Sequence, residues 1–217
     1  MKLIEIATPP INPIVDEIAH NVMALCKPFL EAIQYKTDTY KLFRGAGKST
    51  NPAVILPGFR KDRKPSDTPL KIHRAVNKVF QTKFGVPFRN GTFATGSYDD
   101  ASAYGSRVYI VIPCHDFKFL WSPGVHDLYD FMCRKVRADY GKFEILGQNP
   151  AVTESVVDYV KKDVFVNLYQ NTNLQQAIAS EYEVMLYSDQ CLYIDADIYD
   201  QVSSSLTVLH SHITEPT

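Results

Sequence analysis

One stretch near the C-terminus, Ala179–Tyr187, most constrains how this chain folds. It is rich in aromatic and β-branched residues and therefore predicts a β-strand. Because strand side chains alternate between two faces, Glu181 and Glu183 are expected on one face, about 7 Å apart. Tyr182 and Val184 are expected on the other face, toward the interior. The two carboxylates either serve one substrate or lie on the solvated outer face of an edge strand.

Length and charge bound the class of protein. The 217 residues suit a single domain, residues 1–217, and a hydrophobic fraction of 45% is enough for a packed core. A net charge of -1 excludes a global field that attracts nucleic acid or membrane. The charge is uneven, however, because seven Lys or Arg residues and only two Asp residues lie between Arg60 and Lys78. This stretch is either a contact surface for phosphates or a solvated loop and helix face.

The cysteines and the N-terminal residues bear on the compartment. Cys26, Cys114, Cys133 and Cys191 are scattered without CxxC spacing, so neither a disulfide framework nor a zinc site is expected. The N-terminal run MKLIEIATPP lacks the continuous apolar segment of a signal peptide. Because no apolar run reaches about 18 residues, no membrane span is expected. These features predict a cytoplasmic protein with free thiols and no membrane partner.

Local patterns predict a mixture of helices and strands. Apolar residues at helical spacing predict helices over residues 14–35, 70–84, 99–104, 125–143 and 149–169. Pro28 is expected to kink or split the first of these. Short apolar runs predict strands over residues 40–44, 107–113, 183–187 and 191–194. The proline-rich stretch 51–69 is expected to be irregular, and the Ser-rich tail from Val202 is expected to be loose.

Two apparent motifs fail on their spacing. The run GAGKST at residues 45–50 resembles a phosphate-binding P-loop, but Leu42 stands where the first glycine belongs and Asn51-Pro52 replaces the following helix. The acids near the end of the chain lack the glycine and closing glutamate of a calcium loop. No metal site is therefore predicted.

Two further pieces of sequence, far upstream, supply groups for related chemistry. Arg44 and Gly45 end a short strand. The arginine offers a planar charged fork, and the glycine allows a ligand to approach the main chain. Thr95 and Ser97 bring two hydroxyl groups to the start of another strand. The chain thus contains, in order, an arginine, two hydroxyls and two carboxylates.

In this order the three pieces resemble the ADP-ribosyltransferase family of the arginine/serine/glutamate class, the cholera-toxin-like branch. The family pattern is an aromatic-Arg-Gly strand, a hydroxyl-rich strand and a Glu-x-Glu strand followed by a hairpin. The resemblance covers about residues 40–194 and extends to small transferases of phages and bacterial toxins. The chain departs from the pattern at Gly96, where a hydroxyl is missing, and in the long span 112–181.

The resemblance implies an α+β fold, with a split core of two small mixed sheets, an N-terminal helix and a helical insertion. It implies NAD as co-substrate. Glu183 would stabilise the oxocarbenium-like state formed when the nicotinamide–ribose bond breaks, as in glycoside hydrolysis. Glu181 would orient or deprotonate the acceptor. Thr95, with Ser97 alongside, would support Glu183 and the ribose.

The same resemblance implies roles on the NAD side. Arg44 would bind the pyrophosphate through charge-assisted, bidentate hydrogen bonds. The main chain of Gly45 would hold the nicotinamide amide. Tyr98 or Tyr104 would stack on the ribose and nicotinamide, although either ring also suits an ordinary core or surface position.

The acceptor is a macromolecule in every version of this hypothesis. Because a carboxylate pairs with a planar cation, Glu181 favours an arginine side chain on a protein. The rival acceptor is a nucleic-acid base, with the stretch 60–78 along the phosphates. A further alternative, suggested by Gly96, is a catalytically weakened NAD-binding or interaction module.

Overall fold

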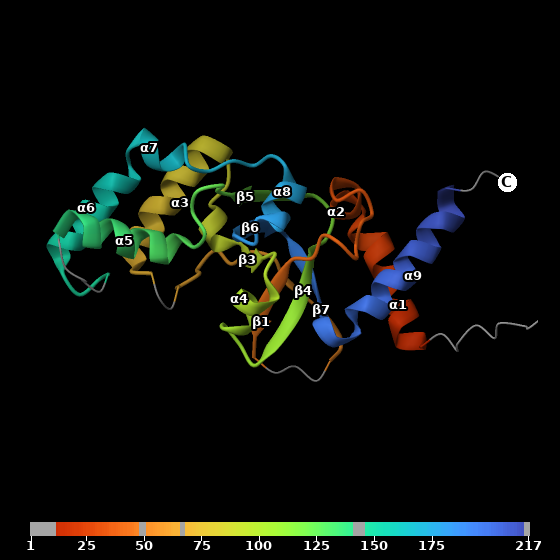
Figure 1. Ribbon diagram of the computed structural model, residues 1–217. Coiled ribbons are helices and arrows are strands. Elements are labelled where there is room, and N and C mark those ends of the chain that lie inside the picture. The colour runs from red at the N-terminus through yellow and green to blue at the C-terminus, as the bar shows by residue number, and fades with distance from the viewer. Residues whose placement is uncertain (1–11, 48–50, 66–67, 141–145, 215–217) are drawn as a thin grey trace, which may run out of the picture.

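The computed structural model describes residues 12–47, 51–65, 68–140 and 146–214, which form a mixed α+β fold (Figure 1). Its strands pair in the order β2-β7-β4-β1-β3-β6-β5, and every pairing is antiparallel. The strands are β1 (Phe43–Ala46), β2 (Ala53–Pro57), β3 (Thr92–Thr95), β4 (Arg107–Pro113), β5 (Phe117–Trp121), β6 (Glu183–Ser188) and β7 (Gln190–Asp195). The α+β class is confirmed, whereas the expectation of two mixed sheets is wrong, since the described strands form one antiparallel sheet.

Strands β1 and β3, at the middle of this sheet, are joined over a very short length. Strands β1 and β3 share a single register pair, Phe43 with Thr95, whereas β1 pairs with β4 at four positions and β3 pairs with β6 at four. Beyond that pair, a side chain replaces the main-chain hydrogen bonds between β1 and β3. Nη1 of Arg44 donates a 2.6 Å hydrogen bond to the carbonyl of Phe93. The sheet therefore consists of a four-stranded and a three-stranded half, which diverge between β1 and β3.

Helices cover the four-stranded half at one end of the molecule (Figure 1). Helices α1 (Pro13–Leu25), α2 (Lys27–Ala32) and α9 (Ala196–Thr214) lie there, and α1 packs against α9. Their apolar residues share one core with β4 and β7. Pro28 lies in the first turn of α2, so the predicted helix is split, as expected from the fixed φ and missing N–H of proline.

A second helical group covers the other end, beside the three-stranded half (Figure 1). It has its own apolar core, which includes Phe80, Phe88, Phe165 and Met185. Its helices are α3 (Leu70–Phe84), α5 (Leu128–Tyr140), α6 (Pro150–Val160) and α7 (Asp163–Val166). Three short helices remain. Helix α4 (Tyr98–Ser102) contacts β1 and β3. Helix α8 (Leu174–Ala179) leads into β6, and the 3-10 helix η1 (Phe88–Asn90) leads into β3.

Sequence expectations for the segments that form β2, β5 and α9 are wrong. The stretch 51–69 contains a strand, β2, which pairs with β7 over five residues. Strand β5 has no counterpart among the predicted strands, although it pairs with β6 over five residues. The Ser-rich tail is helical as α9, because Val202 and Leu206 lie on one face and are buried in the core. The four cysteines are free, as predicted, and all four are buried. No described helix has the length and apolar content needed to cross a membrane.

Candidate functional site

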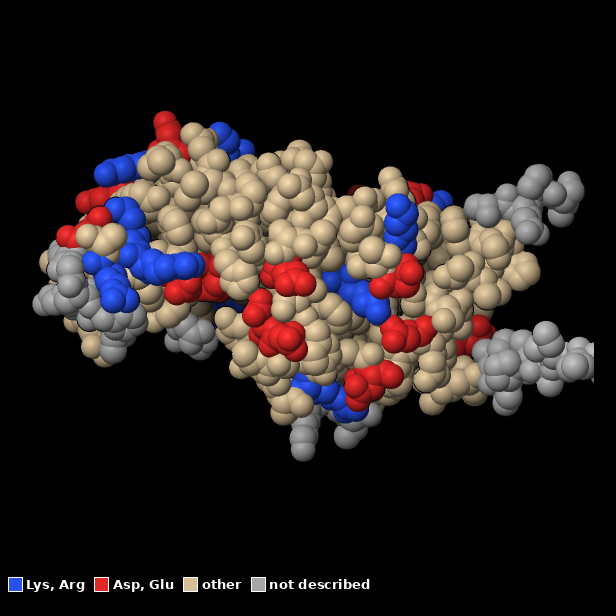
Figure 2. All heavy atoms as spheres, viewed as in Figure 1, with Lys and Arg blue, Asp and Glu red and all other residues tan. Residues whose placement is uncertain are grey.

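A pocket of about 340 Å³ opens where β1 and β3 diverge. The molecular surface is hollowed between the end that carries α5 and the part that carries α4 (Figure 2). Six of the seven predicted site residues line the pocket: Arg44, Gly45, Thr95, Tyr104, Glu181 and Glu183. Ser97 does not line it. The fold therefore brings together residues that are up to 139 positions apart in the chain.

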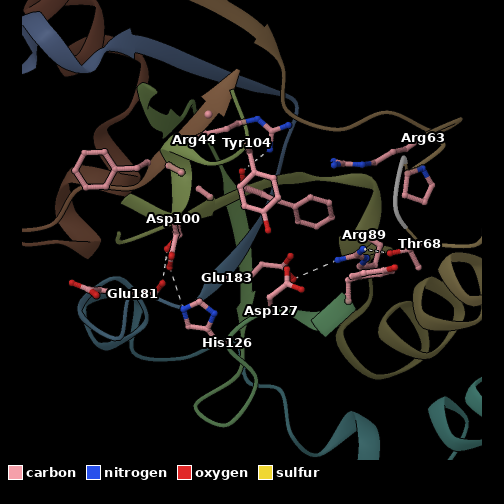
Figure 3. Close-up of a pocket in the computed structure, with 18 residues that line it drawn as sticks. Arg44, Arg63, Thr68, Arg89, Asp100, Tyr104, His126, Asp127, Glu181 and Glu183 are labelled. Atoms are coloured by element: carbon pink, nitrogen blue, oxygen red, sulfur yellow. Dashed lines mark hydrogen bonds and ion pairs between the residues drawn. The ribbon is translucent and has the colours of Figure 1, made fainter. Parts of the chain in front are cut away.

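Glu183 lies at the centre of this pocket (Figure 3). It is the first residue of β6, and its N–H donates to the carbonyl of His126 at 2.8 Å. Its side chain is 17% exposed, and Nη1 of Arg89 lies 3.4 Å from its Oε1. Burial raises the pKa of the Glu183 carboxyl, which Arg89 partly offsets and Asp127 reinforces. The Glu183 carboxylate is thus largely shielded from water and lies beside the Arg89 guanidinium.

Arg89 belongs to η1, and sequence reasoning missed it. Its side chain is 6% exposed, Nη2 donates to the hydroxyl of Thr68 at 3.3 Å, and its guanidinium lies 4.5 Å from the ring centre of Phe93. Its Nε is buried without a hydrogen-bond partner. Arg89 is therefore a buried cation whose guanidinium is only partly paired, which is costly in free energy.

Arg63, also missed, reaches the same ring from another segment. Its guanidinium lies 4.0 Å from the ring centre of Phe93, Nη1 donates to the carbonyl of Gly91, and Nε is buried without a partner. Burial and the neighbouring cations Arg44 and Arg89 lower the pKa of Arg63 to about 9. Three arginines therefore crowd one side of the pocket, where their positive charges add.

The opposite side of the pocket is acidic (Figure 3). Asp100 of α4 lies there, with its Oδ2 3.1 Å from Nε2 of His126. His126 also packs edge-on against Tyr182, with ring centres 5.0 Å apart. Acidic side chains gather on the surface over α4 (Figure 2). The pocket is thus polarised, with guanidinium groups on one wall and carboxylates on the other.

Glu181 does not share a strand face with Glu183, so that expectation is wrong. Helix α8 ends at Ala179, Glu181 has a left-handed backbone with φ of 63°, and β6 begins only at Glu183. Glu181 is exposed, and its carboxylate points away from that of Glu183 (Figure 3). The reason is the turn from helix into strand, which breaks the two-residue alternation.

The two predicted hydroxyls act mainly on local structure. Thr95 is the register partner of Glu183, but its hydroxyl donates to the carbonyl of Glu181 and accepts from the N–H of Ser97 at 3.1 Å. Ser97 is the N-cap of α4, and its Oγ accepts from the N–H of Asp100 at 3.2 Å. The expected support of the Glu183 carboxylate by Thr95 is therefore replaced by bonds that fix the turn before β6.

Two glycines are explained by close packing. A Cβ atom on Gly45 would lie 2.0 Å from the carbonyl oxygen of Ala101, so α4 could not pack on β1. A Cβ atom on Gly96 would lie 1.9 Å from the carbonyl oxygen of Ile178. The main chain of α8 therefore leaves no room for a side chain at Gly96. Tyr104 lies at the rim of the pocket and is 69% exposed.

Little in the sequence could have identified the missed residues. Arg63 belongs to the basic stretch, and Asp100 belongs to the acidic first turn of α4. Nothing local distinguishes Arg89, His126 or Thr68 from surface residues. The described residues contain no group of three or more His, Cys, Asp or Glu side chains that could hold a metal ion. Comparison with family models, curated proteins and solved structures finds no match to this chain.

Proposed function

We propose that this protein is a mono-ADP-ribosyltransferase that binds NAD in the pocket between β1 and β3. The observation that carries the proposal is the position of Glu183, which lies beside Arg89, 17% exposed, at the centre of a pocket with one arginine-rich wall. The volume of about 340 Å³ falls in the range of small-molecule sites. The divergence of the two halves of the single sheet leaves room for a ligand between β1 and β3.

The arginine wall suits the diphosphate of NAD. Guanidinium groups bind phosphate oxygens through paired, charge-assisted hydrogen bonds. Arg44 lies at the point where the strands diverge, and Arg63 and Arg89 line the same pocket. A bound diphosphate carries two negative charges and would offset most of the positive charge of the three arginines. It would leave the nicotinamide ribose facing Glu183.

The chemical step is cleavage of the bond between nicotinamide nitrogen and ribose C1. The electron pair of that bond leaves with nicotinamide, and the positive charge that develops on the ribose is stabilised by a nearby carboxylate. Glu183 supplies the carboxylate in its ionised form. A nucleophile of the acceptor then bonds to C1 and loses a proton, and hydrolysis results when that nucleophile is water.

The first acceptor proposed is an arginine side chain of a protein. The acidic wall formed by Asp100 and Glu181 suits a cationic group entering from outside, and Glu181 is exposed at the pocket. The second candidate is a nucleic-acid base. It is favoured by Arg63, which lines both this pocket and a basic hollow beside it.

The proposed location is the cytoplasm. Free buried thiols fit its reducing conditions.

The test measures nicotinamide release and transfer of label from adenylate-labelled NAD, with cell lysate as acceptor. We expect Glu183→Gln to lower nicotinamide release at least 100-fold, because the developing cation loses its carboxylate. Glu31→Gln is the matched control, because Glu31 is exposed on α2 at the other end of the molecule. Absence of release and transfer in the wild type, together with unchanged behaviour of Glu183→Gln, would refute the proposal. NAD binding by calorimetry without turnover would instead identify a catalytically weakened module.

Glu181→Gln separates the acceptor step from NAD cleavage. We expect it to keep most of the hydrolysis and to lose most of the transfer, because Glu183 is still present. Equal loss of both activities would assign Glu181 to the NAD site. Label that survives protease and disappears with nuclease would replace the protein acceptor with nucleic acid.

A further inference from the structure

A second hollow, of about 430 Å³, lies beside the candidate site. It is formed by the loop 61–64, by one face of α3 and by residues near η1. Five of its lining residues are cations, and Asp62 is its single lining acid. These cations are Lys61, Arg63, Lys64, Arg74 and Lys78. The hollow is therefore strongly basic although the whole chain carries a net charge of -1.

Four of these cations are available to a ligand. Lys61, Lys64, Arg74 and Lys78 are exposed, and none of them forms an ion pair with a described acid. Arg74 and Lys78 are four residues apart on α3, so they project from one face on successive turns. By contrast, Lys71 on the same helix is paired with Glu154 of α6.

The floor of the hollow is also polar. His73 lines it and is buried, with 3% of its surface exposed. Its Nε2 lies within hydrogen-bond distance of both Asn77 and Asn90, whereas Nδ1 has no partner. Burial, with the cations Arg89 and Arg63, lowers the pKa of His73 to about 4. The ring is therefore neutral near pH 7 in a region of positive potential.

Arg63 connects the hollow to the candidate active site, because it lines both. We propose that the hollow binds the sugar-phosphate backbone of a single-stranded nucleic acid, which then passes the mouth of the pocket. Exposed cations in a row neutralise successive phosphates and release their counterions. At the pocket rim, Tyr104 offers a ring on which a base stacks. The inference concerns binding and does not depend on the transferase activity.

The surroundings of α3 argue for a single strand over a duplex. An element that reads a duplex enters the major groove, about 12 Å wide, with its exposed face free on both sides. Helix α3 is flanked by the loop 61–64 on one side and packs against α6 on the other. A flexible single strand can follow such a hollow. A peptide rich in acids carries similar charge but lacks the bases that stack, so it serves as the competing ligand in the test.

The experiment measures binding of the full chain to a fluorescein-labelled 20-mer of uridine RNA by anisotropy at several salt concentrations. Four phosphate contacts predict that log K falls against log salt with a slope of about -3, since each contact to a single strand contributes about -0.7. The variant Arg74→Glu/Lys78→Glu is expected to bind at least tenfold more weakly. The control Lys36→Glu/Lys162→Glu changes the charge equally at exposed positions outside the hollow and is expected to bind like the wild type.

Several outcomes would overturn the inference. They are undetectable binding, equal weakening by both double variants, tighter binding of a duplex of the same length, or equally effective competition by poly-glutamate. Thermal unfolding checks that both variants are folded. Nicotinamide release is measured in parallel and is expected to stay at the wild-type rate in both. A failure of nucleic-acid binding is therefore distinguishable from a failure of the transferase proposal.

Discussion

Nη1 of Arg89 lies 3.4 Å from Oε1 of Glu183, across 94 residues of sequence. Both side chains are largely withdrawn from water, at 6% and 17% exposure. A buried ion pair contributes little net stability, but removal of one partner leaves an uncompensated charge. This pair therefore links the stability of the fold to the ionisation of the proposed catalytic carboxylate.

Replacement of Arg89 by methionine tests this link. Arg89→Met is expected to destabilise the fold at pH 7 by roughly 3 kcal/mol, because Glu183 is left buried without its cation. Urea unfolding followed by circular dichroism measures the change. The double variant Arg89→Met/Glu183→Gln is expected to recover much of the loss, since neither position of the pair then carries a charge. Strictly additive effects of the two changes would show that the residues do not interact.

Glu183 also predicts a pH dependence of stability. Because burial raises its pKa, the folded state holds this proton more tightly than the unfolded chain. The associated stability is complete below about pH 4.3, the usual glutamate value, and is lost as the pH rises through the raised pKa. Glu183→Gln is therefore expected to gain stability relative to the wild type as the pH rises from this value. Urea unfolding between acid and neutral pH measures this difference, and a pH-independent difference would contradict it.

His73 predicts a dependence of the opposite sign. Its pKa is lowered to about 4 in the fold, so the unfolded chain binds the proton more tightly. His73 alone is expected to lower the stability of the wild type by roughly 3 kcal/mol as the pH falls from about 6.5 to about 4, since a tenfold change in proton affinity is about 1.36 kcal/mol. His73→Gln removes this contribution. If the variant and the wild type lose stability in parallel over this range, the assignment to His73 is wrong.

Gly96 tests the close packing of the turn before β6 against α8. Gly96→Ser places a Cβ atom 1.9 Å from the carbonyl oxygen of Ile178, so the turn before β6 must shift. A cost of about 3 kcal/mol or more is expected from such overpacking. Gly124→Ser is the matched control, because a Cβ atom added at Gly124 would meet no described atom within 4 Å. Thermal unfolding compares the two, and equal midpoints would refute the packing explanation.

Local patterns were sufficient for several elements. Helix α3 spans the predicted residues 70–84, because Ile72, Val76 and Phe80 recur at helical spacing and are all buried. Strand β4 spans the predicted residues 107–113, and its composition matches burial on both faces. In these segments the apolar pattern alone indicates which residues are buried. The predicted bounds of α3 and β4 therefore do not depend on neighbouring elements.

Other segments depended on distant partners. Strands β2 and β5 form the two edges of the sheet. They pair with β7 and β6, which satisfies the hydrogen-bonding groups of their main chains, and no local sequence pattern predicts this pairing. Helix α9 is held by its apolar face against α1, which outweighs the loose character that its serines predict. The early start predicted for β6 failed because α8 and the turn at Glu181 occupy the residues before it.

Sequence alone was enough for the α+β class, most helices and the order of Arg44, Thr95 and Glu183 along the chain. The folded arrangement was needed to learn that Arg63 and Arg89 join Arg44 on one wall, and that Glu181 faces away from Glu183. The physical reason is that periodicity records which side of an element is apolar. The energy of a charge depends instead on desolvation and on distances to groups from other parts of the chain, which exist only after folding.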